Sequence, residues 1–160
     1  MYDLKATAHR IHGRLVVHIS GQLADTCIYA DVIDKYPGGN RVYFVDPGAA
    51  QVFISERKLS PGPCLEMLVP WYATVHLVDE AHKEVEIFVN EQKELTVPIK
   101  EAREYNVYAL TGEPQRKAKC FIWPADAVVL AIYSKVFGPA SHAECEKYVK
   151  ENCSKSAAAK

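Results

Sequence analysis

The chain has 160 residues, of which 49% are hydrophobic and 24% charged, and its 19 basic and 20 acidic side chains give a formal net charge of -1. A chain of this length can bury a sizeable core without depending on disulfides, and we expect one domain with a small appendage. The near balance of charge argues against a nucleic-acid partner or an anionic membrane surface. A transmembrane helix needs about 18 consecutive apolar residues, and the sequence has no such run.

Short β-prone runs follow one another through the first two thirds of the chain, separated by Pro/Gly/Asp/Asn turn chemistry. The runs are residues 15–20, 27–33, 41–45, 50–55, 73–78, 85–89, 95–99 and 105–110. In the run 85–89, apolar residues at alternate positions put one face toward a core, as in a half-buried strand. About six to eight such strands predict a mainly β fold, specifically an antiparallel β-sandwich or barrel rather than a βαβ fold.

The pattern changes after Gly112. A polar connector leads to an apolar run, 127–133, which we expect to be a strand buried on both faces and ended by Gly138-Pro139. Ser141 and Glu144 form a capping box, which predicts a helix through about Asn152. We therefore expect a β-sandwich domain over residues 1–113, a strand-helix appendage packed on it over 114–153, and a disordered tail over 154–160.

The N-terminal segment Met1 to Lys5 is too polar for the apolar core of a signal peptide. This leaves two readings: a cytoplasmic protein, or the mature form of an exported one. The five cysteines leave at least one thiol unpaired in a monomer, and in the cytosol all five would be reduced.

Two of the cysteines lie in recognisable settings where a loop meets an apolar run. The segments are Gly21-Gln22-Leu23-Ala24-Asp25-Thr26-Cys27 and Cys64-Leu65-Glu66-Met67-Leu68-Val69-Pro70-Trp71. They resemble the G-x-L-x-D-x-C and C-x-x-x-L-V-P-aromatic elements of secreted bacterial immunoglobulin-like β-sandwich domains, mostly of unassigned function. The resemblance covers residues 14–100. It implies an immunoglobulin-like sandwich, an extracytoplasmic location in the secreted or periplasmic space, and a disulfide between Cys27 and Cys64.

Under this reading a second disulfide would tie Cys120 to the final helix through either Cys145 or Cys153. Cys145 and Cys153 are poor partners for each other, because eight residues of helix place them about 12 Å apart, beyond disulfide reach. The sequence leaves the partner of Cys120 open.

Few residues suggest reaction chemistry. His9, His12 and His18 come closest to a metal motif, but residues three apart on a strand face opposite ways, so surface histidines are the default. Cys145 near a helix start could be a nucleophile, yet Glu144 and Glu146 oppose thiolate formation. We predict no catalytic, cofactor-binding or metal-ligating residue.

The function expected from the sequence is that of a non-catalytic module, structural or binding a protein or a glycan. Eight aromatic residues are a candidate binding face, although we favour the alternative that they pack in and around the core: Tyr29, Tyr36, Tyr43, Phe44, Trp71, Tyr72, Tyr105 and Tyr108. A candidate binding loop comprises Pro61, Gly62, Pro63, Trp71 and Tyr72. One rival is a secreted inhibitor or effector that presents this rigid loop, because a preorganised loop loses less entropy on binding. A second rival is a small thiol- or metal-dependent enzyme.

Overall fold

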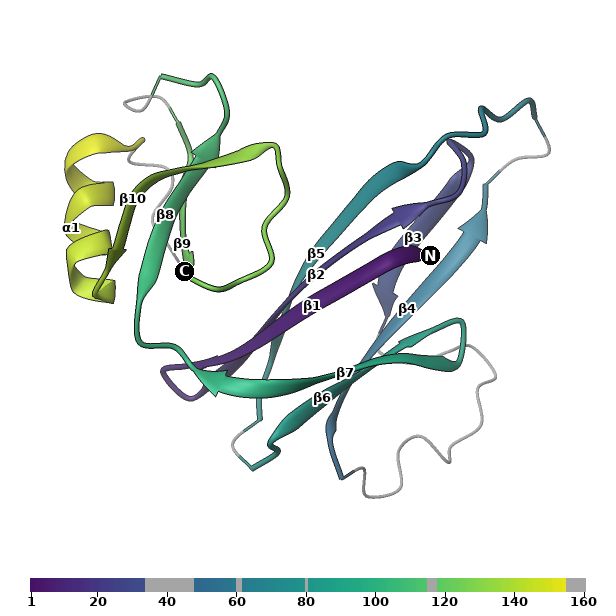
Figure 1. Cartoon of the computed structure of the whole chain (residues 1–160), viewed down its shortest axis with the longest axis horizontal. Helices are drawn as coiled ribbons and strands as arrows, with labels where there is room; N and C mark the ends of the chain where they lie inside the picture. The colour runs from purple at the N-terminus through teal and green to yellow at the C-terminus, as the bar shows by residue number, and fades with distance from the viewer. Residues whose placement is uncertain (34–47, 60–61, 80, 115–117, 155–160) are drawn as a thin grey trace. The chain divides into compact units, whose positions relative to one another are not determined.

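A computed structural model describes residues 1–33, 48–59, 62–79, 81–114 and 118–154 of the protein (Figure 1). The chain divides into two compact units, unit 1 over Met1–Lys100 and unit 2 over Glu101–Lys160. Each unit has its own sheet, and the described part of the chain is mainly β, as the sequence predicts.

Unit 1 is built on a seven-stranded sheet. Its strands are β1 (Tyr2–Ile11), β2 (Arg14–Leu23), β3 (Ile28–Ile33), β4 (Ala50–Lys58), β5 (Val69–Leu77), β6 (Glu84–Val89) and β7 (Gln92–Glu101). They follow the order β3-β4-β6-β7-β1-β2-β5. The expected strand at 41–45 lies outside the described residues.

The seven-stranded sheet is mixed, because β4 pairs with β6 in parallel, with Val52 opposite Ile87. The chain leaves β4, forms β5 beside β2, and only then returns to place β6 next to β4. This crossover differs from the expected antiparallel immunoglobulin-like sandwich. One sheet curves into a nearly closed, barrel-like form, and its two outermost strands meet where the Trp71 indole Nε1 donates to the Ala30 carbonyl at 2.9 Å.

The core of unit 1 lies on the concave side of this sheet. On β2, Leu15, Val17 and Ile19 are fully buried at alternate positions, so one face of the strand points inward. Ile54 and Ile87 from β4 and β6 join the same cluster and are also fully buried. The alternation that the sequence displays in 85–89 is therefore the alternation that fills this core.

Unit 2 has a three-stranded antiparallel sheet and one helix. The strands are β8 (Tyr105–Leu110), β9 (Cys120–Pro124) and β10 (Tyr133–Ala140), in the order β10-β8-β9, and the helix is α1 (His142–Asn152). The helix contacts all three strands. Its buried residues Cys145 and Val149 face the sheet, and Tyr148 stacks on Phe137 with ring centroids 4.6 Å apart.

The predicted helix and its capping box are confirmed. Ser141 Oγ accepts from the Glu144 backbone N–H at 3.2 Å, and the Glu144 carboxylate accepts from the Ser141 backbone N–H at 2.9 Å. The Glu144 carboxylate accepts from both the Ser141 backbone N–H and the Ser141 hydroxyl, and these two bonds lower the pKa of Glu144 because they favour its ionised form.

The predicted strand over 127–133 is wrong. Residues 127–132 form turns, in which the Ala127 N–H donates to Pro124 O at 3.0 Å and the Tyr133 N–H donates to Leu130 O at 3.1 Å. The strand begins only at Tyr133 and continues through Gly138-Pro139, which was expected to end it. Proline is tolerated there because β10 is an edge strand, where a lost N–H donor breaks no ladder on the open side.

The boundary between the units also differs from the expected one at residue 113. Contacts divide the chain after Lys100, because β8, which the sequence assigned to the first domain, pairs with β9 and β10. A short β-prone run carries no signal of which sheet it joins. Of the predicted tail 154–160, residues 155–160 lie outside the described residues, whereas Ser154 belongs to unit 2 and its N–H donates to Ala118 O at 3.1 Å.

Candidate functional site: a disulfide-held apolar loop

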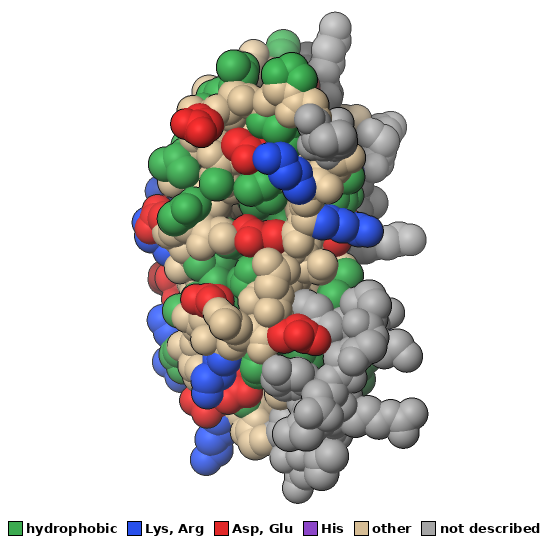
Figure 2. Space-filling view, turned by 90° about the vertical axis from the view of Figure 1, so that its right-hand side faces the viewer, with side chains coloured by type: hydrophobic (Ala, Val, Ile, Leu, Met, Phe, Trp, Pro, Cys, Tyr) green, Lys and Arg blue, Asp and Glu red, His purple; other side chains and the backbone are tan. Residues whose placement is uncertain are grey.

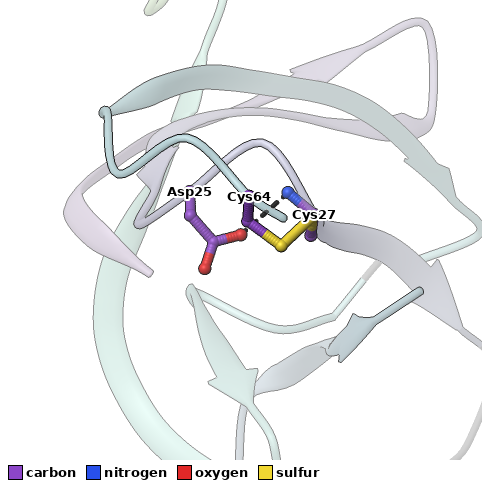
Figure 3. A group of neighbouring side chains, drawn as sticks. All are labelled: Asp25, Cys27 and Cys64. Atoms are coloured by element: carbon purple, nitrogen blue, oxygen red, sulfur yellow. Dashed lines mark hydrogen bonds between the residues drawn. A yellow bond between two sulfur atoms is a disulfide. The ribbon is translucent and has the colours of Figure 1, made fainter. Parts of the chain in front are cut away.

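A disulfide joins Cys27, just before β3, to Cys64, in the segment that leads into β5 (Figure 3). The two Cα atoms are 5.6 Å apart. The Asp25 carboxylate accepts the Cys27 backbone N–H at 2.8 Å, which closes an Asx turn and fixes the chain just ahead of the sulfur. This is the bond that the family resemblance implies, and it links the segments that lead into the two outermost strands of the sheet.

Backbone hydrogen bonds hold the segment after the disulfide. The Thr26 N–H donates to Leu65 O at 3.2 Å, and the Thr26 hydroxyl accepts the Leu65 N–H at 3.1 Å. On the other side of the bridge the Leu59 N–H donates to Cys27 O at 3.0 Å. One covalent bond and three hydrogen bonds therefore set the conformation of this part of the chain.

The side chains of this fixed segment point into solvent. We call residues 62–68 the apolar loop, because its members Leu65, Met67 and Leu68 are 69%, 52% and 54% exposed. Leu59, just before it, is 68% exposed. Figure 2 looks onto the side of the molecule where this loop lies and shows hydrophobic side chains gathered in its upper half, interrupted by acidic groups. Apolar side chains held rigidly in water favour association with another apolar surface.

The predicted binding loop coincides only in part with the apolar loop. Gly62 and Pro63 are exposed beside Cys64, and Pro61 lies outside the described residues. Trp71 does not belong to an exposed binding loop as predicted. Its ring packs against the core of unit 1, and its Nε1 donates to the Ala30 carbonyl, so this side chain closes the sheet. Tyr72 is half-buried, and its hydroxyl accepts from the Thr74 hydroxyl at 3.2 Å.

Sequence reasoning missed the three exposed apolar residues of the loop. Because these residues lie between Cys64 and β5, their apolar side chains resemble the start of the strand, in which alternate side chains are expected to be buried. The available signal was the Cys64 anchor itself, since a disulfide fixes a loop without requiring its side chains to pack.

Of the five described residues of the candidate aromatic face, Tyr29 alone is exposed, at 44%, which favours the alternative that these aromatic residues pack. Tyr36, Tyr43 and Phe44 lie outside the described residues, and Trp71 packs on the core. Tyr105 is buried and Tyr108 half-buried, three residues apart on one strand, so they face opposite sides of the sheet. Tyr108 instead joins an aromatic cluster that sequence reasoning missed, with Phe121, Trp123 and Tyr133.

The histidines do not assemble as a metal motif. His12 occupies the two-residue turn between β1 and β2 with a φ of 48°, whereas His9 and His18 are buried in the strands. Burial lowers the pKa of His18 to about 4, and the charges of His9 and His76 act in the same direction. Across the described ranges, one group of three potential ligands lies within coordination distance, Asp25 with Cys27 and Cys64, and there both sulfurs are bonded to each other.

The other cysteines have structural settings. Cys120, at the start of β9, is bonded to Cys153, the residue that caps α1, and both are almost fully buried. Cys145 is a buried thiol whose Sγ donates to Tyr105 O at 3.5 Å. Burial, with a smaller contribution from Glu144, raises the pKa of Cys145, which is the opposite of what a nucleophilic cysteine requires.

Comparisons of the chain with protein-family models, with curated proteins and with solved structures found no match. Within the part of the chain that the structure describes, no helix has the length and apolar character needed to cross a bilayer. The two disulfides suggest an oxidising, extracytoplasmic environment.

Proposed function

We propose that the protein is a non-catalytic, secreted or periplasmic binding module that uses the apolar loop to bind another protein. One observation carries this proposal: Leu65, Met67 and Leu68 are each more than half exposed, on a segment whose backbone is held by a disulfide and by hydrogen bonds to Thr26. Because the loop is already ordered, binding costs little conformational entropy.

The chemistry of the loop favours a protein partner over a glycan. Apart from Glu66, its exposed side chains are apolar and include two leucines and a methionine, which fit an apolar groove, and methionine adapts readily to irregular apolar surfaces. Glycans are bound chiefly by exposed aromatic rings and polar groups, whereas Trp71 is committed to the sheet closure. The oxidising environment that the two disulfides suggest agrees with this role.

The experiment is photo-crosslinking followed by a binding measurement. A photoreactive residue replaces Leu65 in one preparation and Val78 in another, since Val78 is 92% exposed and lies beyond the other end of β5. We expect a crosslinked protein from the extracytoplasmic extract at position 65 only. The purified partner is then titrated calorimetrically: Leu65→Asp should weaken binding by at least about tenfold, and the matched control Val78→Asp should leave it unchanged.

Equal crosslinking at both positions, or equal affinity of wild type and Leu65→Asp for the purified partner, would contradict the proposal. Circular dichroism of each variant establishes that its sheet is intact before binding is compared.

A further inference from the structure

We propose that the Cys27–Cys64 disulfide is a redox switch that regulates the binding function proposed above, on which this regulation rests. A dithiol reductant opens the bond, the apolar loop loses its fixed shape, and the protein loses affinity for its partner. The Cys120–Cys153 disulfide stays closed under the same conditions.

The two disulfides differ in their access to a reductant. Cys27 and Cys64 are both half-buried, and the residues on either side of Cys64 are exposed. Cys120 and Cys153 are only 1% and 8% exposed. A thiolate must reach a sulfur atom to exchange with it, so the Cys27–Cys64 bond reacts first.

The opening step is thiol–disulfide exchange, which transfers two electrons from the reductant to the bond. One thiolate of the dithiol attacks a sulfur of the Cys27–Cys64 bond, which forms a mixed disulfide and releases the other cysteine as a thiolate. The second thiolate of the reductant then attacks the mixed disulfide and releases the remaining cysteine. The dithiol ends as a disulfide, and the two protons that it loses balance those that the two cysteines take up.

The disulfide pins the connection that runs from Lys58 at the end of β4 to Val69 at the start of β5. Hydrogen bonds between Thr26 and Leu65 accompany it, at 3.2 and 3.1 Å, but both residues are exposed, so water competes for the same groups. The side chains of the apolar loop are themselves in water, so little burial holds them in place. Opening the covalent bond therefore releases the loop.

The rest of unit 1 keeps its structure when the bond opens. The Asp25 carboxylate accepts the Cys27 N–H at 2.8 Å through a backbone group that reduction does not alter (Figure 3). The Trp71 indole still reaches the Ala30 carbonyl, and core residues such as Ile54 are fully buried. The reduced protein is thus folded with a loose loop, which loses more conformational entropy on binding than the fixed loop does.

The first experiment measures which disulfide opens. The full chain is incubated with dithiothreitol at about pH 8 and alkylated at intervals with iodoacetamide, and mass spectrometry follows each cysteine. We expect Cys27 and Cys64 to be alkylated together, at least about tenfold faster than Cys120 and Cys153. Cys145, the buried free thiol, should stay unlabelled as long as unit 2 is folded. A smaller difference between the two pairs overturns the proposal.

The second experiment measures binding in the open form. A photoreactive residue at position 65 is placed in the disulfide-bonded chain and in a variant with Cys27→Ser and Cys64→Ser, which represents the reduced form without added reductant. In the extracytoplasmic extract, the variant should form the crosslinked product of the parent chain with a yield at least about tenfold lower. The matched control Cys145→Ala, which removes a thiol outside both disulfides, should crosslink like the parent chain.

The outcomes separate this regulation from the binding function itself. Equal crosslinking by the parent chain and the double serine variant overturns the switch and leaves the proposed function standing. No specific crosslink from position 65 in either chain overturns both. Loss of the sheet in the double serine variant, measured by circular dichroism, also overturns the switch, because the disulfide would then support the sheet rather than the loop.

Discussion

The two units use the same covalent device in opposite surroundings. In unit 2 the Cys120–Cys153 disulfide is almost fully buried and fastens the end of α1 to the sheet. In unit 1 the Cys27–Cys64 disulfide is half-buried, joins the segments that lead into the two outermost strands and anchors a loop of exposed apolar residues. The first disulfide completes a core, and the second fixes the shape of a surface.

The two units depend on their disulfides to different degrees. Unit 1 has a large apolar cluster of its own, including Leu15, Ile19, Ile54 and Ile87, all fully buried. Unit 2 is small and sets one helix against three short strands. Small assemblies bury less of their surface and rely more on cross-links.

The largest expected effect is on unit 2. Replacing both Cys120 and Cys153 by Ala should lower its free energy of unfolding by about 4 kcal/mol, because the cross-link no longer restricts the unfolded chain. The measurement is denaturant unfolding followed by the fluorescence of Trp123 in a Trp71→Phe background, since each unit contains one of the two tryptophans. Loss of less than about 1 kcal/mol would mean that helix packing alone holds unit 2.

In unit 1 the corresponding double replacement, Cys27→Ala with Cys64→Ala, removes a cross-link of similar span and should also cost about 4 kcal/mol, but the sheet should remain folded at room temperature because unit 1 has a large buried core. The distinctive result is local: hydrogen exchange at the Leu65 amide should accelerate far more than at Ile54 in the core. Uniform acceleration at both amides would show that the disulfide supports the whole sheet rather than the loop.

Acid should weaken unit 1 through His18. Its pKa is about 4 in the folded protein and 6.5 when unperturbed, so between these values the unfolded chain binds a proton that the folded chain does not. The stability is therefore fully present above pH 6.5 and falls as the pH drops toward 4, by up to about 3 kcal/mol. Urea unfolding at a series of pH values, followed by Trp71 fluorescence in a Trp123→Phe background, measures this slope. His18→Gln should flatten it, and an unchanged slope in that variant contradicts the assignment.

The smallest expected effect concerns the side chains of the apolar loop. Leu65→Ser and Met67→Ser should each change the stability of unit 1 by less than about 0.5 kcal/mol, because both side chains are already in water. The matched core change Val17→Ala, at a fully buried position, should cost about 2 kcal/mol. A cost for Leu65→Ser comparable to that of Val17→Ala would mean that the loop packs in solution.

Local patterns succeeded where neighbouring residues decide the outcome. The capping box at Ser141 predicted α1 because its two hydrogen bonds join residues three apart. The prediction of a strand over 127–133 failed because continuous hydrophobicity has no period that distinguishes a strand from a half-buried turn segment. The candidate site was predicted in part: Cys64 marked the loop, but nothing local revealed that Trp71 would turn inward to Ala30 and Leu65 outward.

The sequence by itself determined that this is a mainly β protein with a capped C-terminal helix, since alternation and capping act over a few residues. Tertiary structure alone decided that β4 and β6 run in parallel, that β8 belongs to unit 2, and that Arg10 meets Asp79 and His82. Each of these pairs residues that are far apart along the chain. Their free energy comes from burial and complementary charge in the folded state, which short-range patterns do not encode.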